Sequence, residues 1–165
     1  MTRETQRENV IDEFYDYLLG VRQVYTDIIP VLREEIDQIA RDDVAALDET
    51  IKRQQALVLR TRNFDDKIAG YLERLGIAAP TLTETVQAFP EEDRFRFYDF
   101  LGEFDRIVEQ VDFYRDKCRE LLQSKLYSID KRLAGVPNTR ESVTYDEKAG
   151  EVTKSLHSKT FEKTI

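Results

Sequence analysis

The feature that most constrains the fold is the stretch of residues 91–134, which contains no proline and a single isolated glycine, Gly102. Its apolar residues recur at steps of three and four, which places them on one stripe of a helix. A helix of this length spans about 65 Å. It cannot bury the stripe against itself and therefore requires partner helices. The stripe comprises Phe97, Phe100, Leu101, Phe104, Ile107, Val108, Val111, Tyr114, Cys118, Leu121, Leu122, Leu126, Ile129 and Leu133.

An earlier stripe of the same spacing predicts a helix over residues 9–40. Pro30 lies inside this helix, where it removes a backbone N–H and crowds the carbonyl of Thr26. Two outcomes are open: a kink in one continuous helix, or a break with Asp27 capping a new one. The apolar spacing continues through Pro30 and Gly20, which favours one kinked helix. The stripe comprises Val10, Ile11, Phe14, Tyr17, Leu18, Val21, Val24, Tyr25, Ile28, Leu32, Ile36 and Ile39.

Asp42 and Asp43 end that helix, and either carboxylate can cap the next one, predicted over residues 44–75. So short a connection makes the two helices antiparallel. Gly76 is a stop signal, and a short helix is predicted over residues 81–89, capped by Thr81 or Thr83. Pro90 and three acidic residues then start the long helix over 91–134.

The predicted fold class is therefore all-α: an elongated antiparallel bundle of three long helices with one short connecting helix. Residues 1–138 form this bundle, because the Gly-Val-Pro-Asn sequence after residue 134 stops the last helix. Residues 139–165 carry only isolated apolar side chains, which offer too little area to offset the entropy of ordering. We expect them to form a flexible, mobile C-terminal tail.

Three polar residues interrupt the apolar seam of the second helix: Gln54, Thr61 and Asp65. Either they lie at the partly exposed edge of a narrow helical hairpin, or they fix the register of the helices, as polar seam residues do in coiled coils.

Composition and charge exclude several classes of function. A net charge of −8 and an isoelectric point near 4.9 argue against nucleic acid and against an anionic membrane face. The sequence shows no apolar signal core, no apolar run long enough to insert into a membrane, and a single cysteine. These observations favour a cytoplasmic location.

The sequence does not favour an enzyme, a cofactor or a metal. The only histidine, His157, lies in the predicted tail, and Cys118 falls on the apolar stripe of the long helix. Glu-x-x-His pairs and glycine-rich phosphate-binding patterns are absent. One group of acidic residues is interpreted as a solvated face and a helix cap: Glu34, Glu35, Asp37, Asp42 and Asp43.

Aromatic residues crowd the start of the long helix and recur later in it. We expect most of them to pack on the first two helices and on the short helix over residues 81–89, and the remainder to form an exposed patch of the kind that marks a partner site. Phe113 and Tyr127 are candidates for that patch because they fall off the main stripe. The full set is Phe95, Phe97, Tyr98, Phe100, Phe104, Phe113, Tyr114 and Tyr127.

Four segments, in this order and spacing, resemble the FlgN-type flagellar export chaperones. Residues 43–47 are similar to the family's turn between its first two long helices, and residues 82–86 to its short Thr-Leu-x-x-hydrophobic segment. Residues 116–122 and 129–133 resemble its Asn-x-x-Leu-Leu stretch, with Cys118 in place of Asn. Residues 144–150 are similar to its Thr-Tyr-x-x-x-Gly tail motif, with one extra residue before Gly150.

This resemblance implies a cytoplasmic chaperone that binds the hook-associated proteins of the hook–filament junction and delivers them to the flagellar export gate. It assigns gate docking, on the cytoplasmic domain of a membrane protein, to Tyr145. It assigns client binding to the end of the long helix and to the tail, at Leu121, Leu122, Leu126, Ile129, Leu133, Val152, Leu156 and Phe161.

A second hypothesis is a structural coiled-coil module that associates with itself or scaffolds another helical partner. The polar seam residues Gln54 and Asp65 disfavour very tight self-association, so a monomer or a weak homodimer is expected.

Overall fold

A computed structural model describes residues 3–78 and 81–135. Every regular element in these two ranges is an α-helix, which confirms the predicted all-α class. The predicted tail, residues 139–165, lies outside them. The helices are α1 (Arg3–Arg41), α2 (Val44–Thr61), α3 (Phe64–Leu75), α4 (Leu82–Gln87) and α5 (Glu91–Ala134).

Helix α1 is continuous through Pro30, so the alternative of two helices split at Asp27 is excluded. Pro30 is exposed, and so is Thr26, whose carbonyl loses its helical partner at the proline. Because this part of the helix is exposed, water can reach that carbonyl, and the helix tolerates the proline.

The turn from α1 to α2 uses two aspartates. Asp42 adopts a left-handed conformation with φ 57°, and its N–H donates to the carbonyl of Ile39. The N–H of Asp43 donates to the carbonyl of Gln38, which completes a Schellman motif. The side chain of Asp43 then accepts from the N–H of Ala46 at 3.1 Å and caps α2. This two-residue turn forces α2 to run back along α1.

The prediction of one helix over residues 44–75 is wrong. The helix is interrupted at Arg62 and Asn63, and α3 begins at Phe64. The Thr61 hydroxyl donates to the carbonyl of Val58 at 2.8 Å, and Asn63 belongs to the residues that favour caps over helix interiors. The side chain of Asn63 makes no capping hydrogen bond, so the Thr61 bond and the low helix propensity of Asn63 accompany a break that contains no glycine or proline.

The short helix and the end of α3 agree more closely with the sequence. Thr81 caps α4 by accepting from the N–H of Glu84, and α4 ends at Gln87 rather than at the predicted Phe89. Gly76 ends α3 in the left-handed region with φ 66°. There the N–H of Ile77 donates to the carbonyl of Leu72 at 2.9 Å.

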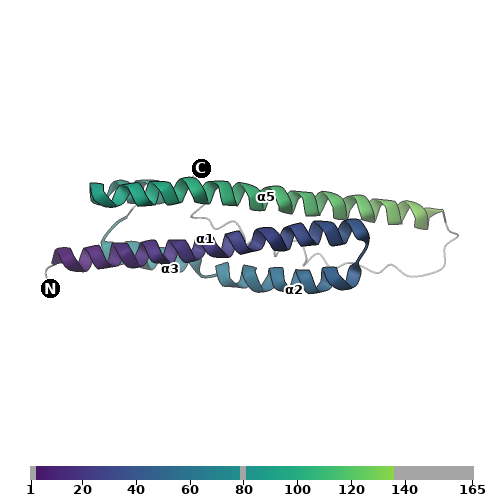
Figure 1. The fold of residues 1–165 in the computed structure, drawn as a ribbon, viewed down its shortest axis with the longest axis horizontal. Helices are drawn as coiled ribbons and strands as arrows, with labels where there is room; N and C mark the ends of the chain where they lie inside the picture. The colour runs from purple at the N-terminus through teal and green to yellow at the C-terminus, as the bar shows by residue number, and fades with distance from the viewer. Residues whose placement is uncertain (1–2, 79–80, 136–165) are drawn as a thin grey trace.

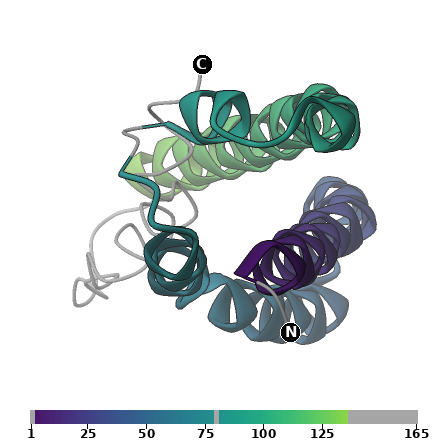
Figure 2. The same cartoon turned by 90° about the vertical axis from the view of Figure 1, so that its left-hand side faces the viewer.

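Helix α1 lies between α5 on one side and α2 and α3 on the other (Figure 1, Figure 2). Because α2 and α3 run back along α1, α1 and α5 point in the same direction. Their ion pairs show this, since Asp12 pairs with Arg96, Arg22 with Glu103, and Asp42 with Lys125. The register between α1 and α5 is therefore nearly constant from one end of the bundle to the other.

An aromatic cluster joins the helices at the N-terminal end of α1. The ring of Phe14 lies 5.3 Å from that of Tyr71 in α3, 6.5 Å from that of Phe89 and 5.9 Å from that of Phe97 in α5. Phe14, Phe89 and Phe97 are fully buried. Aromatic pairs at these separations add to the free energy of area burial, so this cluster anchors α3, the segment between α4 and α5, and α5 to one another through α1.

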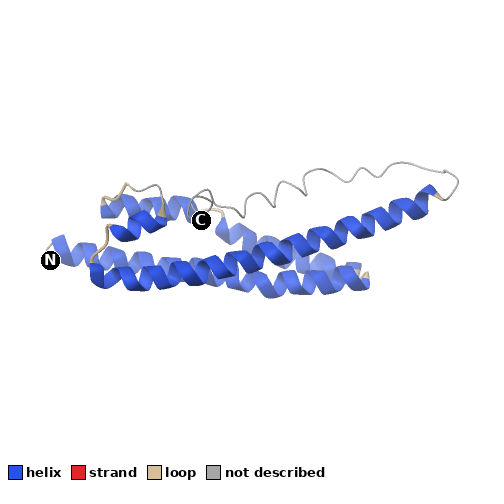
Figure 3. Ribbon diagram, turned by 90° about the horizontal axis from the view of Figure 1, so that it is seen from above, coloured by secondary structure: helices blue, strands red, loops and turns tan. Residues whose placement is uncertain are grey.

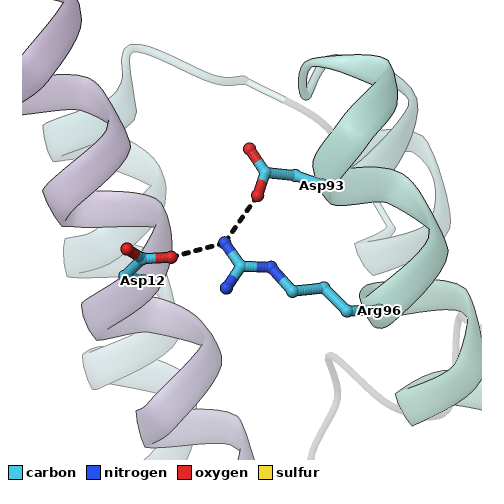
Figure 4. Close-up of polar contacts among 3 residues, drawn as sticks. All are labelled: Asp12, Asp93 and Arg96. Atoms are coloured by element: carbon cyan, nitrogen blue, oxygen red, sulfur yellow. Dashed lines mark hydrogen bonds and ion pairs between the residues drawn. The ribbon is translucent and has the colours of Figure 1, made fainter.

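Arg96 fixes the first turns of α5 against α1 (Figure 4). Its Nη2 lies 2.6 Å from Asp12 of α1 and 2.6 Å from Asp93 of α5. The same guanidinium stacks over Tyr15, with its Cζ 4.9 Å from the ring centroid. These contacts set the register of α5, and so they determine which residues of α5 lie beside the other end of α1.

Candidate functional site

The face of α5 that packs on α1 repeats every seven residues. Phe97, Phe104, Val111 and Cys118 occupy successive repeats, and none of them is more than 5% exposed. The next repeat falls on Lys125. The change from apolar residues to a lysine marks the position where α5 loses its partner helices.

Helix α1 ends at Arg41, and Lys125 contacts that end directly. Its Nζ lies 2.7 Å from Oδ1 of Asp42 and 3.4 Å from the carbonyl oxygen of Ala40. A cation at this place satisfies a terminal carbonyl and suits the negative end of the helix dipole. Beyond Lys125, α5 continues for nine residues, about 14 Å, past the turn between α1 and α2 (Figure 1, Figure 3).

We call residues 122–134 the α5 extension. Its apolar side chains continue the stripe that is buried further back, but here they are exposed. Leu122 is 40% exposed, Leu126 53%, Ile129 49% and Leu133 62%. These four residues form the extension stripe. A soluble helix seldom exposes a continuous apolar row unless it binds something there.

The extension stripe contains four of the predicted client-binding residues. The fifth, Leu121, is partly buried and packs against the core. The remaining predicted site residues, Val152, Leu156, Phe161 and Tyr145, lie outside the described residues. Sequence reasoning missed Lys125, although a charge at the seven-residue position was a visible signal that the buried seam ends there.

A buried carboxyl group lies close to the start of the extension. Glu35, interpreted from the sequence as part of a solvated face, is only 6% exposed, so that interpretation is wrong for this residue. It occupies a core position of α1, three residues after Leu32 and four before Ile39. Burial raises the pKa of Glu35, and a hydrogen bond from the Cys118 thiol opposes that shift in part.

Cys118 is buried, as its place on the stripe predicted. Burial and the neighbouring Glu35 carboxylate raise the pKa of its thiol to about 12. Its Sγ lies 3.7 Å from the carbonyl oxygen of Leu32. A thiol with so high a pKa is protonated at neutral pH and is a poor nucleophile, so this cysteine has a packing role.

The prediction that most aromatic residues of α5 pack on the other helices is wrong, because four of the eight are exposed. Phe97, Phe100 and Phe104 are buried, whereas Phe113 and Tyr127 are exposed on the face away from α1. Phe95 and Tyr98 are exposed as well, and Phe95 reaches 80%. These exposed rings are spread along the outer face of α5 rather than gathered at one place.

Within residues 3–78 and 81–135, no three histidine, cysteine or acidic side chains come together in a group that could hold a metal ion. Among the helices of the same two ranges, none combines the length and the hydropathy that a membrane span requires.

Comparison of the sequence with known protein families identifies one family. The sequence model of the family described as FlgN protein matches residues 1–153. The chain belongs to the FlgN family. FlgN proteins act as chaperones in flagellar export, so this protein has a chaperone role in assembly of the bacterial flagellum. No curated protein and no solved structure is significantly similar to the chain.

Proposed function

We propose that this FlgN protein binds hook-associated proteins of the hook–filament junction in the cytoplasm and delivers them to the export gate. The observation that carries the proposal is the extension stripe, a row of apolar side chains that α1 and α2 do not cover. An amphipathic helix of a client can lay its apolar face on such a row. Binding of this kind needs no catalytic group.

The stripe alone gives weak binding. Its four side chains are each about half exposed, and covering the remainder contributes roughly 1 kcal/mol each, or about 4 kcal/mol together. A free energy of that size corresponds to a dissociation constant of about 1 mM, before the cost of association is subtracted. This estimate supports a further contribution from the tail, at Val152, Leu156 and Phe161.

A tail that orders only on binding suits a reversible chaperone. The entropy of ordering lowers the affinity while the contact area stays large. The client is then held firmly enough to prevent early association with its partners and is released by competition at the export gate. We assign docking on the cytoplasmic domain of the gate protein to Tyr145.

The stripe is tested by replacing Leu126 and Leu133 together with serine. Both side chains are more than half exposed, so helicity and melting stay unchanged. We expect affinity for a purified hook-associated protein, measured by calorimetry, to fall at least about tenfold. Phe113→Ser is the matched control, because this exposed side chain lies off the stripe. Equal affinities for the double variant and the wild type would refute the proposed site.

The tail is tested by deleting residues 139–165. Helicity and melting should stay nearly intact, whereas capture of a hook-associated protein should be lost. Full affinity in the truncated chain would contradict the assignment to the tail.

Tyr145→Ala should preserve capture but reduce secretion of the client, and unchanged secretion would rule out the docking role.

The extension stripe also favours a second candidate function, a helical module that pairs with another copy of itself. That function requires a stable dimer in sedimentation experiments without any client. A monomer throughout the micromolar range would exclude it.

A further inference from the structure

The packing of α1 on α5 indicates what kind of helix can bind to the extension. Along this seam, α1 supplies apolar residues at steps of three and four, and α5 supplies the complementary row. The two helices run in parallel with nearly constant register. The α1 row stops at Ile39, while the α5 row continues through the extension stripe. The extension therefore presents the surface on which a continued α1 would pack.

The last polar pair of the seam is Asp42 with Lys125. Seven residues further along α5 is Arg132, which the helical period places on the same edge of the stripe as Lys125. Asp42 lies in the turn that follows α1 rather than in the helix. A client helix that lies beyond this turn along the line of α1 would place a residue beside Arg132. A carboxylate at that position would complete an ion pair.

The charge of the extension differs from that of the chain as a whole. Residues 122–134 contain three basic side chains, Lys125, Lys131 and Arg132, and one acidic side chain, Asp130. Lys125 is paired with Asp42, so Lys131 and Arg132 carry the positive charge that remains. The whole chain carries a formal charge of −8. The exposed apolar stripe therefore lies on a locally basic segment of an acidic protein, and such a segment attracts acidic partners.

We propose that the client segment bound by the extension is an acidic amphipathic helix. It continues the path of α1, with apolar residues at steps of three and four on the stripe and a carboxylate opposite Arg132. This inference rests on the proposed function, because it describes the chemistry of the client that the extension stripe captures.

Two designed peptides of about 18 residues serve as probes, and each places leucine at alternating steps of three and four. One has glutamate at the flanking positions and the other has lysine. Binding to the full chain is measured by fluorescence anisotropy at about 50 mM and about 300 mM NaCl. The variants are Arg132→Glu, at the edge of the stripe, and Lys131→Glu, on the face beside Tyr127. They change the net charge equally, so the second variant controls for long-range attraction.

We expect the wild type to bind the glutamate peptide at least about fivefold more tightly than the lysine peptide at the lower salt concentration. The preference should shrink at the higher concentration and be lost in Arg132→Glu, but persist in Lys131→Glu. Leu126→Ser should weaken binding of the glutamate peptide, which locates the peptide on the stripe.

Equal affinities for the two peptides, or equal effects of the two charge reversals, would overturn the inference, as would a failure of both peptides to bind. None of these results decides the proposed function. That function fails if the wild type does not capture a hook-associated protein, and its site fails if the Leu126 and Leu133 double variant captures that protein as well as the wild type does.

Discussion

Glu35 is a charged residue whose surroundings oppose its ionisation. It is buried at a seam position between α1 and α5, and one of its carboxylate oxygens has no hydrogen-bond partner among the described residues. Burial raises its pKa above the ordinary value of 4.5. The folded state therefore holds this proton more tightly than the unfolded state, and the stability that it contributes at low pH is lost as pH rises above about 4.5.

Glu35→Gln removes this titration and keeps the shape of the side chain. We expect the variant to be more stable than the wild type near neutral pH, and the difference to shrink as the pH falls to about 4. Urea unfolding of both proteins from about pH 4 to about pH 8 measures it. A difference that does not change with pH would show that Glu35 ionises normally in the folded protein.

Phe14 and Phe95 are the same residue type in opposite environments. Phe14 joins rings from three other parts of the fold, whereas Phe95 is 80% exposed. Phe14→Ala should destabilise the protein by about 3–5 kcal/mol, and Phe95→Ala should change its stability by less than about 0.5 kcal/mol. Thermal unfolding followed by circular dichroism distinguishes the two. Similar losses in both variants would contradict the assignment of the core.

Single-residue burial was predictable where helical spacing was unambiguous. Phe97, Phe104 and Cys118 follow the period and are buried, and Phe113 departs from it and is exposed. Glu35 was not predictable in this way, because it neighbours Glu34 and Asp37 in an acidic run. Charge suggested solvent, but the period of the α1 seam, which passes through position 35, determined its burial.

The helices themselves were predicted with uneven success. The bounds predicted for α5 are those observed, because Pro90, three acids in the first turn and Gly135 mark its ends. The interruption between α2 and α3 was missed, because the apolar spacing continues across Arg62 and Asn63. The spacing of apolar residues shows which face of a helix is buried. It does not show whether the backbone hydrogen bonds of the helix continue without a break.

Two glycines provide a test at the level of these helices. Gly20 lies inside α1, and a Cβ there would meet no atom within 4 Å. Gly20→Ala should therefore stabilise the protein by about 0.5–1 kcal/mol. Gly76 ends α3 with a positive φ, so Gly76→Ala should destabilise it by about 1 kcal/mol. Equilibrium unfolding in urea measures both changes, and shifts of the same sign would contradict the assigned backbone conformations.

In the bundle as a whole, the lengths of the helices and their register determine which apolar surface stays exposed. Helix α5 is longer than α1, and Arg96 and Lys125 fix the register of the two helices near their ends. In this register α1 starts ahead of α5, so the offset and the extra length of α5 together expose the extension stripe at the other end. The sequence predicted that apolar area would be left over on α5. It did not show that this area begins at Leu122, since that depends on where α1 ends relative to α5. The boundary between bundle and tail at residues 138 and 139 stays a prediction.

Hydrogen–deuterium exchange with and without a hook-associated protein tests the proposed client site most directly. Amide hydrogens of residues 122–134 should exchange more slowly when the client is bound, because the extension then gains a partner helix. Those of residues 97–118, already covered by α1, should be unaffected. Unchanged exchange in the extension, with new protection elsewhere on the bundle, would show that the client binds at another surface.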